Sequence, residues 1–386
     1  MTNIPVYING LGNVSPQKTT DSAHFLEEPL SFEANQLKSL DPGYREHIPA
    51  ELMRRMSRII KMGIAASKIC LKDARIGSAD PLHRNITPDA IITGTGLGCI
   101  EDTEKFLANM IKNNEEFLTP TSFIQSTHNT VAGQIALLLK CHSYNFTYVH
   151  RGISFESALL DAMSQMQMGI LANALVGGSD ELTANSFAIT SRLGFWKQKP
   201  IQTRNLLDDS QRGSIAGEGA SFLFLENQKN EHSYAKLTGV TTFLKPSGSA
   251  EIIERLYHFL GSNELSPEDI SLVILGLNGD PRTDKVYHHF ASTIFPGTSI
   301  AYFKHLCGEY HTASSFATWL AAMVLKTQII PGIIKVPGHI LQKQNSMIAA
   351  EAASNKFMGQ SQALDHVLIY NHFQENNHAF ILLSQP

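Results

Sequence analysis

One stretch of the chain has the arrangement in which α/β enzymes place a nucleophile. Between Asn145 and Glu181 the pattern predicts a buried strand at Phe146–Val149, a tight turn at His150-Arg151-Gly152, a helix and a second buried strand ending at Gly177-Gly178. In a parallel α/β sheet, the turn from a strand into a helix is where ligands and nucleophiles lie. Here that position is Gly152, and a hydrogen side chain cannot attack a substrate.

The reactive side chains near this turn are few. Ser154 is the nearby hydroxyl, but a serine inside a helix more often bonds the preceding turn. His150 and His311 are candidate bases, although a lone histidine is more often a hydrogen-bonded structural residue. The four cysteines are far apart without a CxxC pair, which predicts no disulfide framework and no metal site; they are Cys70, Cys99, Cys141 and Cys307.

A glycine-rich turn follows the strand predicted at the start of Pro88–Cys99. Its glycines, Gly94, Gly96 and Gly98, are spaced GxGxG and lack the later glycine of a dinucleotide fingerprint. No acidic residue follows a second strand at the expected place. We therefore expect no nucleotide site and no cofactor.

The composition predicts a folded protein that binds a small molecule or another protein. The chain has 386 residues, of which 43% are hydrophobic and 17% charged, enough to bury a large core. Its net charge of -4 gives no electrostatic basis for binding nucleic acid or an anionic membrane. The first residues lack a basic region followed by an apolar run, and no apolar stretch is long enough to span a membrane, which predicts a cytoplasmic protein.

The elements that must position the turn alternate between strands and helices. In the first half we expect, in order, a strand Ile4–Asn9 with a turn at Gly10-Leu11-Gly12, one long helix Pro49–Ala74, a helix Glu101–Asn114, an extended loop Leu118–Ser126, a helix Asn129–Lys140 capped by Asn129, and a strand Ser221–Leu225.

The second half repeats this alternation after a polar junction at Asn227–His232. We expect strands at Ala235–Thr241, Ser271–Leu277, His366–Tyr370 and Ala379–Leu383, and helices at Ala250–Leu260, Lys285–Phe290 and Ser314–Thr327. Two similar halves, residues 1–228 and 229–386, predict a duplicated α/β fold with parallel sheets buried between helices.

Six short motifs, in order along the chain, resemble those of the β-ketoacyl synthase family, which has the thiolase fold. They cover roughly residues 88 to 383 and comprise Pro88–Gly98; Thr119-Pro120 with Asn129, Ala132 and Gly133; Gly169 with Gly177-Gly178; Asp208 with Gly213 and Gly217-Glu218-Gly219; Lys304 with Gly308; and Phe373 with Asn377. The resemblance implies two pseudo-duplicated halves in a layered α/β/α/β/α sandwich.

The family condenses acyl chains with an elbow cysteine and two histidines, and this chain changes all three positions. The elbow holds Gly152, and Asn278 stands where the first histidine is expected, so it cannot carry a proton through the reaction. Glu309 takes the place of the second histidine in the loop that keeps Lys304. A carboxylate there would repel the enolate formed by decarboxylation unless burial keeps it protonated.

A family member without its nucleophile and both histidines resembles the chain-length-factor subunits of type II polyketide synthases. The resemblance implies a noncatalytic subunit that pairs with an active ketosynthase and shapes the acyl tunnel in polyketide, aryl polyene or fatty acid biosynthesis. The acyl carrier protein would dock mainly on the active partner. The better-known subunits carry glutamine at the elbow, so glycine at 152 does not support a malonyl decarboxylase role.

The resemblance also implies an interface and a gate. The strand Phe146–Val149 would pair with its counterpart across the dimer axis, and Phe123 and Ile124 would reach the partner's tunnel or pack in the core. Phe155 and Phe373 are candidates for blocking the chain's own pocket.

Two other functions stay open. One is a thiolase-fold acyltransferase or hydrolase with a noncysteine mechanism, using Ser154, His311 and Glu309. The other is a homodimer that only binds an acyl ligand. The sequence does not decide between a heterodimer and a homodimer.

Overall fold

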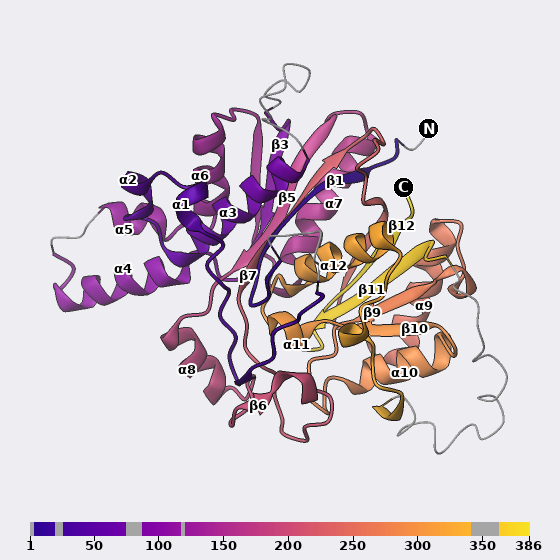
Figure 1. Ribbon diagram of the computed structural model, residues 1–386. Helices are drawn as coiled ribbons and strands as arrows, with labels where there is room; N and C mark the ends of the chain where they lie inside the picture. The colour runs from indigo at the N-terminus through magenta and orange to yellow at the C-terminus, as the bar shows by residue number, and fades with distance from the viewer. Residues whose placement is uncertain (1–3, 20–25, 75–86, 117–119, 341–362) are drawn as a thin grey trace.

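A computed structural model describes residues 4–19, 26–74, 87–116, 120–340 and 363–386 (Figure 1). Its centre is a ten-stranded mixed sheet in the order β10-β9-β11-β12-β8-β1-β7-β5-β3-β4. The strands are β1 Tyr7–Val14, β3 Ala90–Gly94, β4 Tyr144–Tyr148, β5 Asn173–Asp180, β7 Gly219–Glu226, β8 Ala235–Leu244, β9 Leu272–Leu275, β10 Ser299–Tyr302, β11 His366–Phe373 and β12 Asn377–Ser384. A separate two-stranded sheet pairs β2 Glu33–Ala34 with β6 Ile201–Gln202.

The large sheet has two groups of five strands that meet where β1 pairs with β8. That junction is short, with Tyr7 opposite Lys236 and Ile8 opposite Ala235. Within each group the strands nearest the junction are antiparallel, as in β1–β7 and β8–β12, and the outer ones are parallel, as in β3–β4 and β9–β10. The prediction of an α/β fold is confirmed, and the expected parallel pairing is found only among the outer strands of each group, because the strands around the junction are antiparallel.

Helices lie between and outside the two groups of strands (Figure 1). The central helix α12 packs against strands of both groups and is buried at every residue from Ala313 to Leu325, and α7 lies beside it. The helices are α1 Tyr44–His47, α2 Ala50–Met53, α3 Arg58–Asp73, α4 Ile100–Lys112, α5 Pro120–Gln125, α6 Thr130–Leu139, α7 Ser154–Gln167, α8 Ala184–Arg192, α9 Ser249–Ser262, α10 Lys285–Ile294, α11 Lys304–Cys307 and α12 Ala313–Thr327.

The first strand is longer than predicted because its glycines serve packing. β1 continues through Gly10 and Gly12 to Val14, where a turn was expected. A Cβ at Gly12 would lie 2.0 Å from the carbonyl oxygen of Ala66, and one at Gly10 would lie 2.5 Å from the Cβ of Ala74. Helix α3 therefore lies directly on this strand, an approach that only glycine allows.

Two other predictions in the first half need correction. The helix expected at Pro49–Ala74 is broken into α2 and α3, because acidic side chains cap a new start: Glu101 accepts the backbone N–H of Arg58 and Glu181 that of Ile59. The expected loop Leu118–Ser126 holds helix α5, with a proline at its first position, while residues 118–119 lie outside the described part.

The strand predicted as buried at Phe146–Val149 is the exposed edge strand β4. It pairs with β3 on one side only, and Tyr144 and Phe146 are 40% and 46% exposed. The second-half elements lie where predicted with shifted ends; α10, for example, runs on to Ile294. Helix α8, strand β10 and helix α11 were not predicted. No described helix is long and apolar enough to cross a membrane.

Candidate functional site

The elbow between β4 and α7 is closed by an aromatic side chain. Gly152 is buried in a 3-10 turn, Arg151–Ile153, directly before α7. A Cβ built on Gly152 would lie 2.2 Å from the Cβ and 2.9 Å from the Cγ of Phe373, and 3.4 Å from the Cβ of Asn377. Phe373 therefore occupies the space into which a side chain at the elbow would project.

The next two residues of the elbow helix serve the fold. The buried Ser154 hydroxyl donates to the Arg151 carbonyl at 2.7 Å and accepts the His150 backbone N–H at 2.8 Å. The Ser154 hydroxyl therefore bonds the preceding turn, which is the structural role expected of a serine inside a helix. Phe155 is fully buried in the hydrophobic core with Leu159, so the structure places it away from the cavity described below.

Three of the predicted site residues meet in the interior. The Lys304 ammonium lies 2.6 Å from Oε2 of Glu309, and the Asn278 side-chain amide donates to the same oxygen at 3.3 Å. Lys304 and Glu309 are 1% and 2% exposed, so the ion pair is shielded from water. Asp284 accepts the backbone N–H groups of Asn278 and Gly279, and burial raises the pKa of its carboxyl to about 7.

This cluster holds Glu309 by only one of its two oxygens. Within the described part of the chain, Glu309 Oε1 has no hydrogen-bond partner. Lys304 and Asn278 both donate to Oε2 and hold the carboxylate in place. The arrangement is that of a buried ion pair next to an amide.

His311 lies against Phe373, the side chain that closes the elbow. Its ring stacks on the ring of Phe373 with centroids 4.4 Å apart, and a Cβ on Gly96 would lie 2.1 Å from its Cγ. Burial lowers the pKa of the imidazole, so the neutral form is favoured at neutral pH. The structure thus brings His311 close to Phe373, whereas the Ser154 hydroxyl is held by its own turn.

A cavity of 760 Å³ opens beside this elbow. Glu309, His311 and Phe373 line it from the second half of the chain, and Asp180 at the end of β5 and Leu182 just after it line it from the first half. Other lining residues are Gly96, Leu97, Arg151, Glu181, Ser186, Thr190, Leu193, Phe195, Trp196, Gly217, Leu244, Lys245, Tyr310, Gln374, Asn376 and Asn377.

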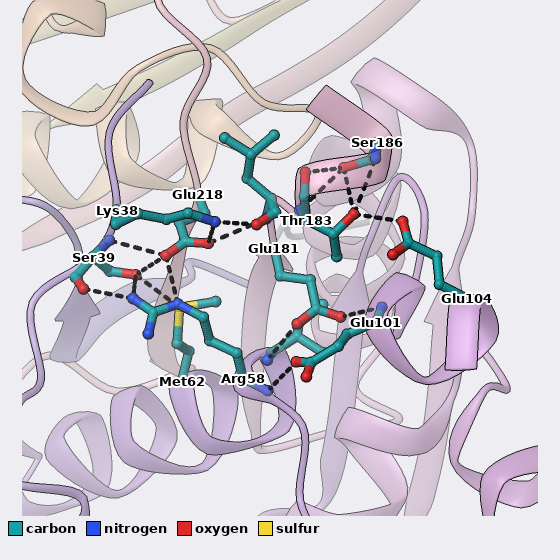
Figure 2. Close-up of polar contacts among 12 residues, drawn as sticks. Lys38, Ser39, Arg58, Met62, Glu101, Glu104, Glu181, Thr183, Ser186 and Glu218 are labelled. Atoms are coloured by element: carbon teal, nitrogen blue, oxygen red, sulfur yellow. Dashed lines mark hydrogen bonds and ion pairs between the residues drawn. The ribbon is translucent and has the colours of Figure 1, made fainter. Parts of the chain in front are cut away.

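A charged network around a buried carboxylate, not predicted from the sequence, supports the wall of this cavity (Figure 2). The fully buried Glu218 carboxylate lies 2.6 Å from Arg58 Nε and 3.2 Å from Lys38 Nζ, and it accepts the backbone N–H groups of Ser39 and Leu182. Glu218 was noted only as part of a Gly-Glu-Gly motif. An acid between two glycines before a strand was the signal that could have identified it.

Glu181, at the other end of this network, joins two helix starts (Figure 2). Its two oxygens accept the backbone N–H of Ile59 in α3 and of Glu101 in α4, both at 3.0 Å. Burial raises the pKa of this carboxyl to about 7, although both hydrogen bonds act in the opposite direction. The network therefore fixes α3 and α4 relative to the strand end that lines the cavity.

Apolar side chains are exposed on the side of the molecule that carries α4, α5 and β4. Phe123 and Ile124, on α5, are 57% and 63% exposed, and the ring of Phe123 lies 5.4 Å from that of Phe106. The structure thus places these two predicted tunnel residues at the surface. Along β4, Tyr144, Phe146 and Tyr148 form consecutive ring contacts on one face of the strand.

The described residues hold no group of three or more His, Cys, Asp or Glu side chains arranged to bind a metal ion. The cysteines are all buried as free thiols.

Comparison with known proteins identifies relatives by family and by fold. Residues 13–231 match the sequence model of the β-ketoacyl synthase N-terminal domain. No curated protein sequence matches the chain. Three similar solved structures each share 17% sequence identity with this chain. The ishigamide ketosynthase/chain length factor has a TM-score of 0.77, with 100% of both chains covered, and a β-ketoacyl synthase from Burkholderia phymatum STM815 has a TM-score of 0.77, with 99% of both chains covered. A ketosynthase in complex with its chain length factor from Xenorhabdus doucetiae has a TM-score of 0.72, with 99% of this chain and 98% of that chain covered. At this identity the structures establish the thiolase-like fold.

Proposed function

Because the chain belongs to the β-ketoacyl synthase family, we propose that it is a noncatalytic, chain-length-factor-like subunit. It pairs with an active ketosynthase and forms part of the wall of the acyl tunnel in polyketide, aryl polyene or fatty acid biosynthesis. The acyl carrier protein contacts the assembly mainly through the active partner.

The observation that carries this proposal is the filled elbow. Acyl transfer by the family's route needs a side-chain nucleophile at the end of β4, and at Gly152 that space is taken by Phe373. The two positions where histidines are expected hold Asn278 and the ion-paired Glu309. The frame of a condensing enzyme is kept while the groups for nucleophilic attack and proton transfer are gone.

The exposed edge strand supports pairing. β4 presents unpaired backbone groups and an aromatic face, and an exposed edge of this kind is a template for another strand. Leu107 and Ile111 on α4 add apolar surface, 45% and 77% exposed. Permanent partners bury about 2,000 Å² or more of mainly apolar surface, which a patch of this composition suits.

Among the similar structures, two are described as a ketosynthase with its chain length factor, and a third as a type II polyketide synthase carrier protein in complex with its ketosynthase. The likeness to the third has a TM-score of 0.77 at 15% identity. These descriptions belong to those proteins; they support a ketosynthase as the partner to test first.

Reconstitution tests the proposal directly. The chain, an active type II ketosynthase, a purified carrier protein and a malonyl donor are combined, and the length and amount of product are measured by mass spectrometry. We expect elongation to need this chain and to be lost when Phe146 is replaced by lysine, because the change places a charge on the pairing strand. Elongation of the same products without this chain would refute the proposal.

The hydrolase alternative has less support from the geometry, because the Ser154 hydroxyl already donates to Arg151 and accepts from His150. Intact-mass measurement after incubation with acyl thioesters gives a direct check: an adduct lost in Ser154→Ala would favour that alternative.

A further inference from the structure

Strand β8 has one edge that is free over most of its length. β12 pairs with it along residues 236–244, whereas β1 pairs with it only at Ala235 and Lys236. The junction ends with a backbone bond from Leu237 to Val6, and the residue before Val6 is Pro5, which has no N–H to continue the ladder. Among the residues that the structure describes, no other strand pairs with this edge.

The alternation of the antiparallel ladder identifies the free backbone groups. Lys245 donates its N–H to the carbonyl of Asn376 at 2.8 Å, on the side of β12. Every second residue of an antiparallel strand points its N–H and C=O groups to the same neighbour. Counting back from Lys245, the backbone groups of Val240, Thr242 and Leu244 therefore point away from β12, toward the free edge.

This edge forms the floor of a groove of 1070 Å³ between two helices. α7 forms one wall, with Leu160 39% exposed, and α9 forms the other. The helices lie on opposite faces of the strand, because Val240 packs in one core with Met163 of α7 and Phe243 packs in another with Phe259 of α9. A strand edge beside a helical wall is suited to binding an extended peptide as an added strand.

The α9 wall carries an acid that is not neutralised. Arg255 lies 2.6 Å from Glu251 and is engaged by that carboxylate. Glu254 is exposed in the same wall, and in the described part of the chain no cation pairs with it. The only other ionisable side chain lining the described groove is His258, so carboxylates outnumber the guanidinium. This wall therefore favours a basic side chain, whereas Leu160 on the α7 wall favours an apolar one.

We propose that this groove binds an extended segment of a partner protein whose side chains alternate between apolar and basic. The segment adds to β8 as a strand and pairs with the backbone of Val240 and Thr242. Its apolar side chains lie against Leu160, and a lysine or arginine lies beside Glu254. Four strands separate β8 from β4 in the sheet order, so this site is a different edge and does not depend on pairing with a ketosynthase.

Synthetic peptides test the pattern on the isolated chain in dilute solution. We expect a short fluorescein-labelled peptide of alternating valine and lysine to bind saturably by fluorescence anisotropy. A peptide of the same composition with its valines and lysines in separate blocks should bind at least about tenfold more weakly, because it cannot match both walls. N-methylation of the valines or of the lysines blocks opposite edges of the peptide, so only one of these two modifications should abolish binding.

Variants of the chain test the two contacts. Thr242→Pro removes an N–H from the free edge but not from the ladder with β12, and should weaken binding about tenfold, whereas Thr242→Ala keeps that N–H and should bind like wild type. Glu254→Gln should weaken binding about threefold, as for loss of an exposed ion pair. Glu268→Gln is its matched control, because Glu268 is exposed and does not line the groove. Circular dichroism verifies that each variant is folded.

Three results would overturn the proposal. The first is equal affinity of wild type for the alternating peptide and both N-methylated peptides, a result that needs no variant of β8. The second is loss of binding in Phe146→Lys with binding kept in Thr242→Pro, which would assign the peptide to β4. The third is a dimer of the chain, detected by analytical ultracentrifugation, that Thr242→Pro abolishes, which would assign the groove to a second copy.

Discussion

Replacing Gly152 by alanine measures the cost in stability of placing a side chain in the space that Phe373 fills. The new methyl group would lie 2.2 Å from the Cβ of Phe373, well inside van der Waals contact, so the strand end carrying Phe373 must move. Overpacking of this kind costs about 1–3 kcal/mol. An unfolding entropy of about 2.1 cal/mol/K per residue gives about 0.8 kcal/mol/K for 386 residues, so the melting temperature should fall by about 1–4 °C.

A second substitution separates this contact from other effects. Phe373→Ala keeps the Cβ that Gly152→Ala would meet, whereas Phe373→Gly removes it. The cost of Gly152→Ala should therefore persist in the Phe373→Ala background and largely disappear in the Phe373→Gly background. Thermal unfolding followed by circular dichroism gives all the values, compared within each background.

Gly261→Ala is the control, because Gly261 lies in α9 and a Cβ there meets nothing within 4 Å. It should raise stability slightly, since alanine is favoured over glycine inside a helix by about 1 kcal/mol. An unchanged melting temperature for Gly152→Ala, or the same cost in both Phe373 backgrounds, would refute the conclusion that Phe373 fills the elbow.

Three further predictions concern the interior and the edge strand. Lys304→Met should lower the free energy of unfolding by about 3–5 kcal/mol, because it leaves Glu309 buried without its ion-pair partner. Adding Glu309→Gln should recover part of this loss, and thermal unfolding measures both variants. Burial raises the pKa of Glu156 from 4.5 to about 7, so the folded state binds the extra proton, and this group alone should lower stability by about 3 kcal/mol from pH 4.5 to 7. Because burial also raises the pKa values of Glu181 and Asp284, Glu156→Gln should reduce the slope of a melting profile across this range without removing it, and an unchanged slope would contradict the assignment. Phe146→Lys should abolish co-purification with the ketosynthase while leaving the melting temperature of the isolated chain within about 1 °C, whereas Tyr257→Lys, at an exposed site on α9, should preserve pairing.

Much of the fold could be predicted because its strands and helices have strong hydrophobic patterns. The buried strand β5 and the helices α7 and α12 lie near their predicted positions. The errors occurred where packing between distant segments decides the local structure. Gly10 and Gly12 suggested a turn, but they are in a strand because α3 lies on it, and no local pattern records that contact.

The candidate site was predictable as a set of positions but not as an arrangement. The resemblance selected Gly152, Asn278, Lys304 and Glu309, and the structure brings the last three together. It could not indicate which oxygen of Glu309 is left without a partner, because that depends on side-chain directions set by residues far apart in the chain. The roles of these residues stay predictions until the variants are measured.

The exposed edge strand β4 has a consequence for the handling of this protein in the cell and in the laboratory. An aromatic strand with free backbone groups can recruit another strand, so the chain made alone should self-associate as its concentration rises. Dilute samples of the isolated chain should therefore be monomeric and concentrated ones should not. Synthesis together with its partner would keep the edge strand covered, so the proportion of the two chains made would decide how much of this chain stays free to self-associate.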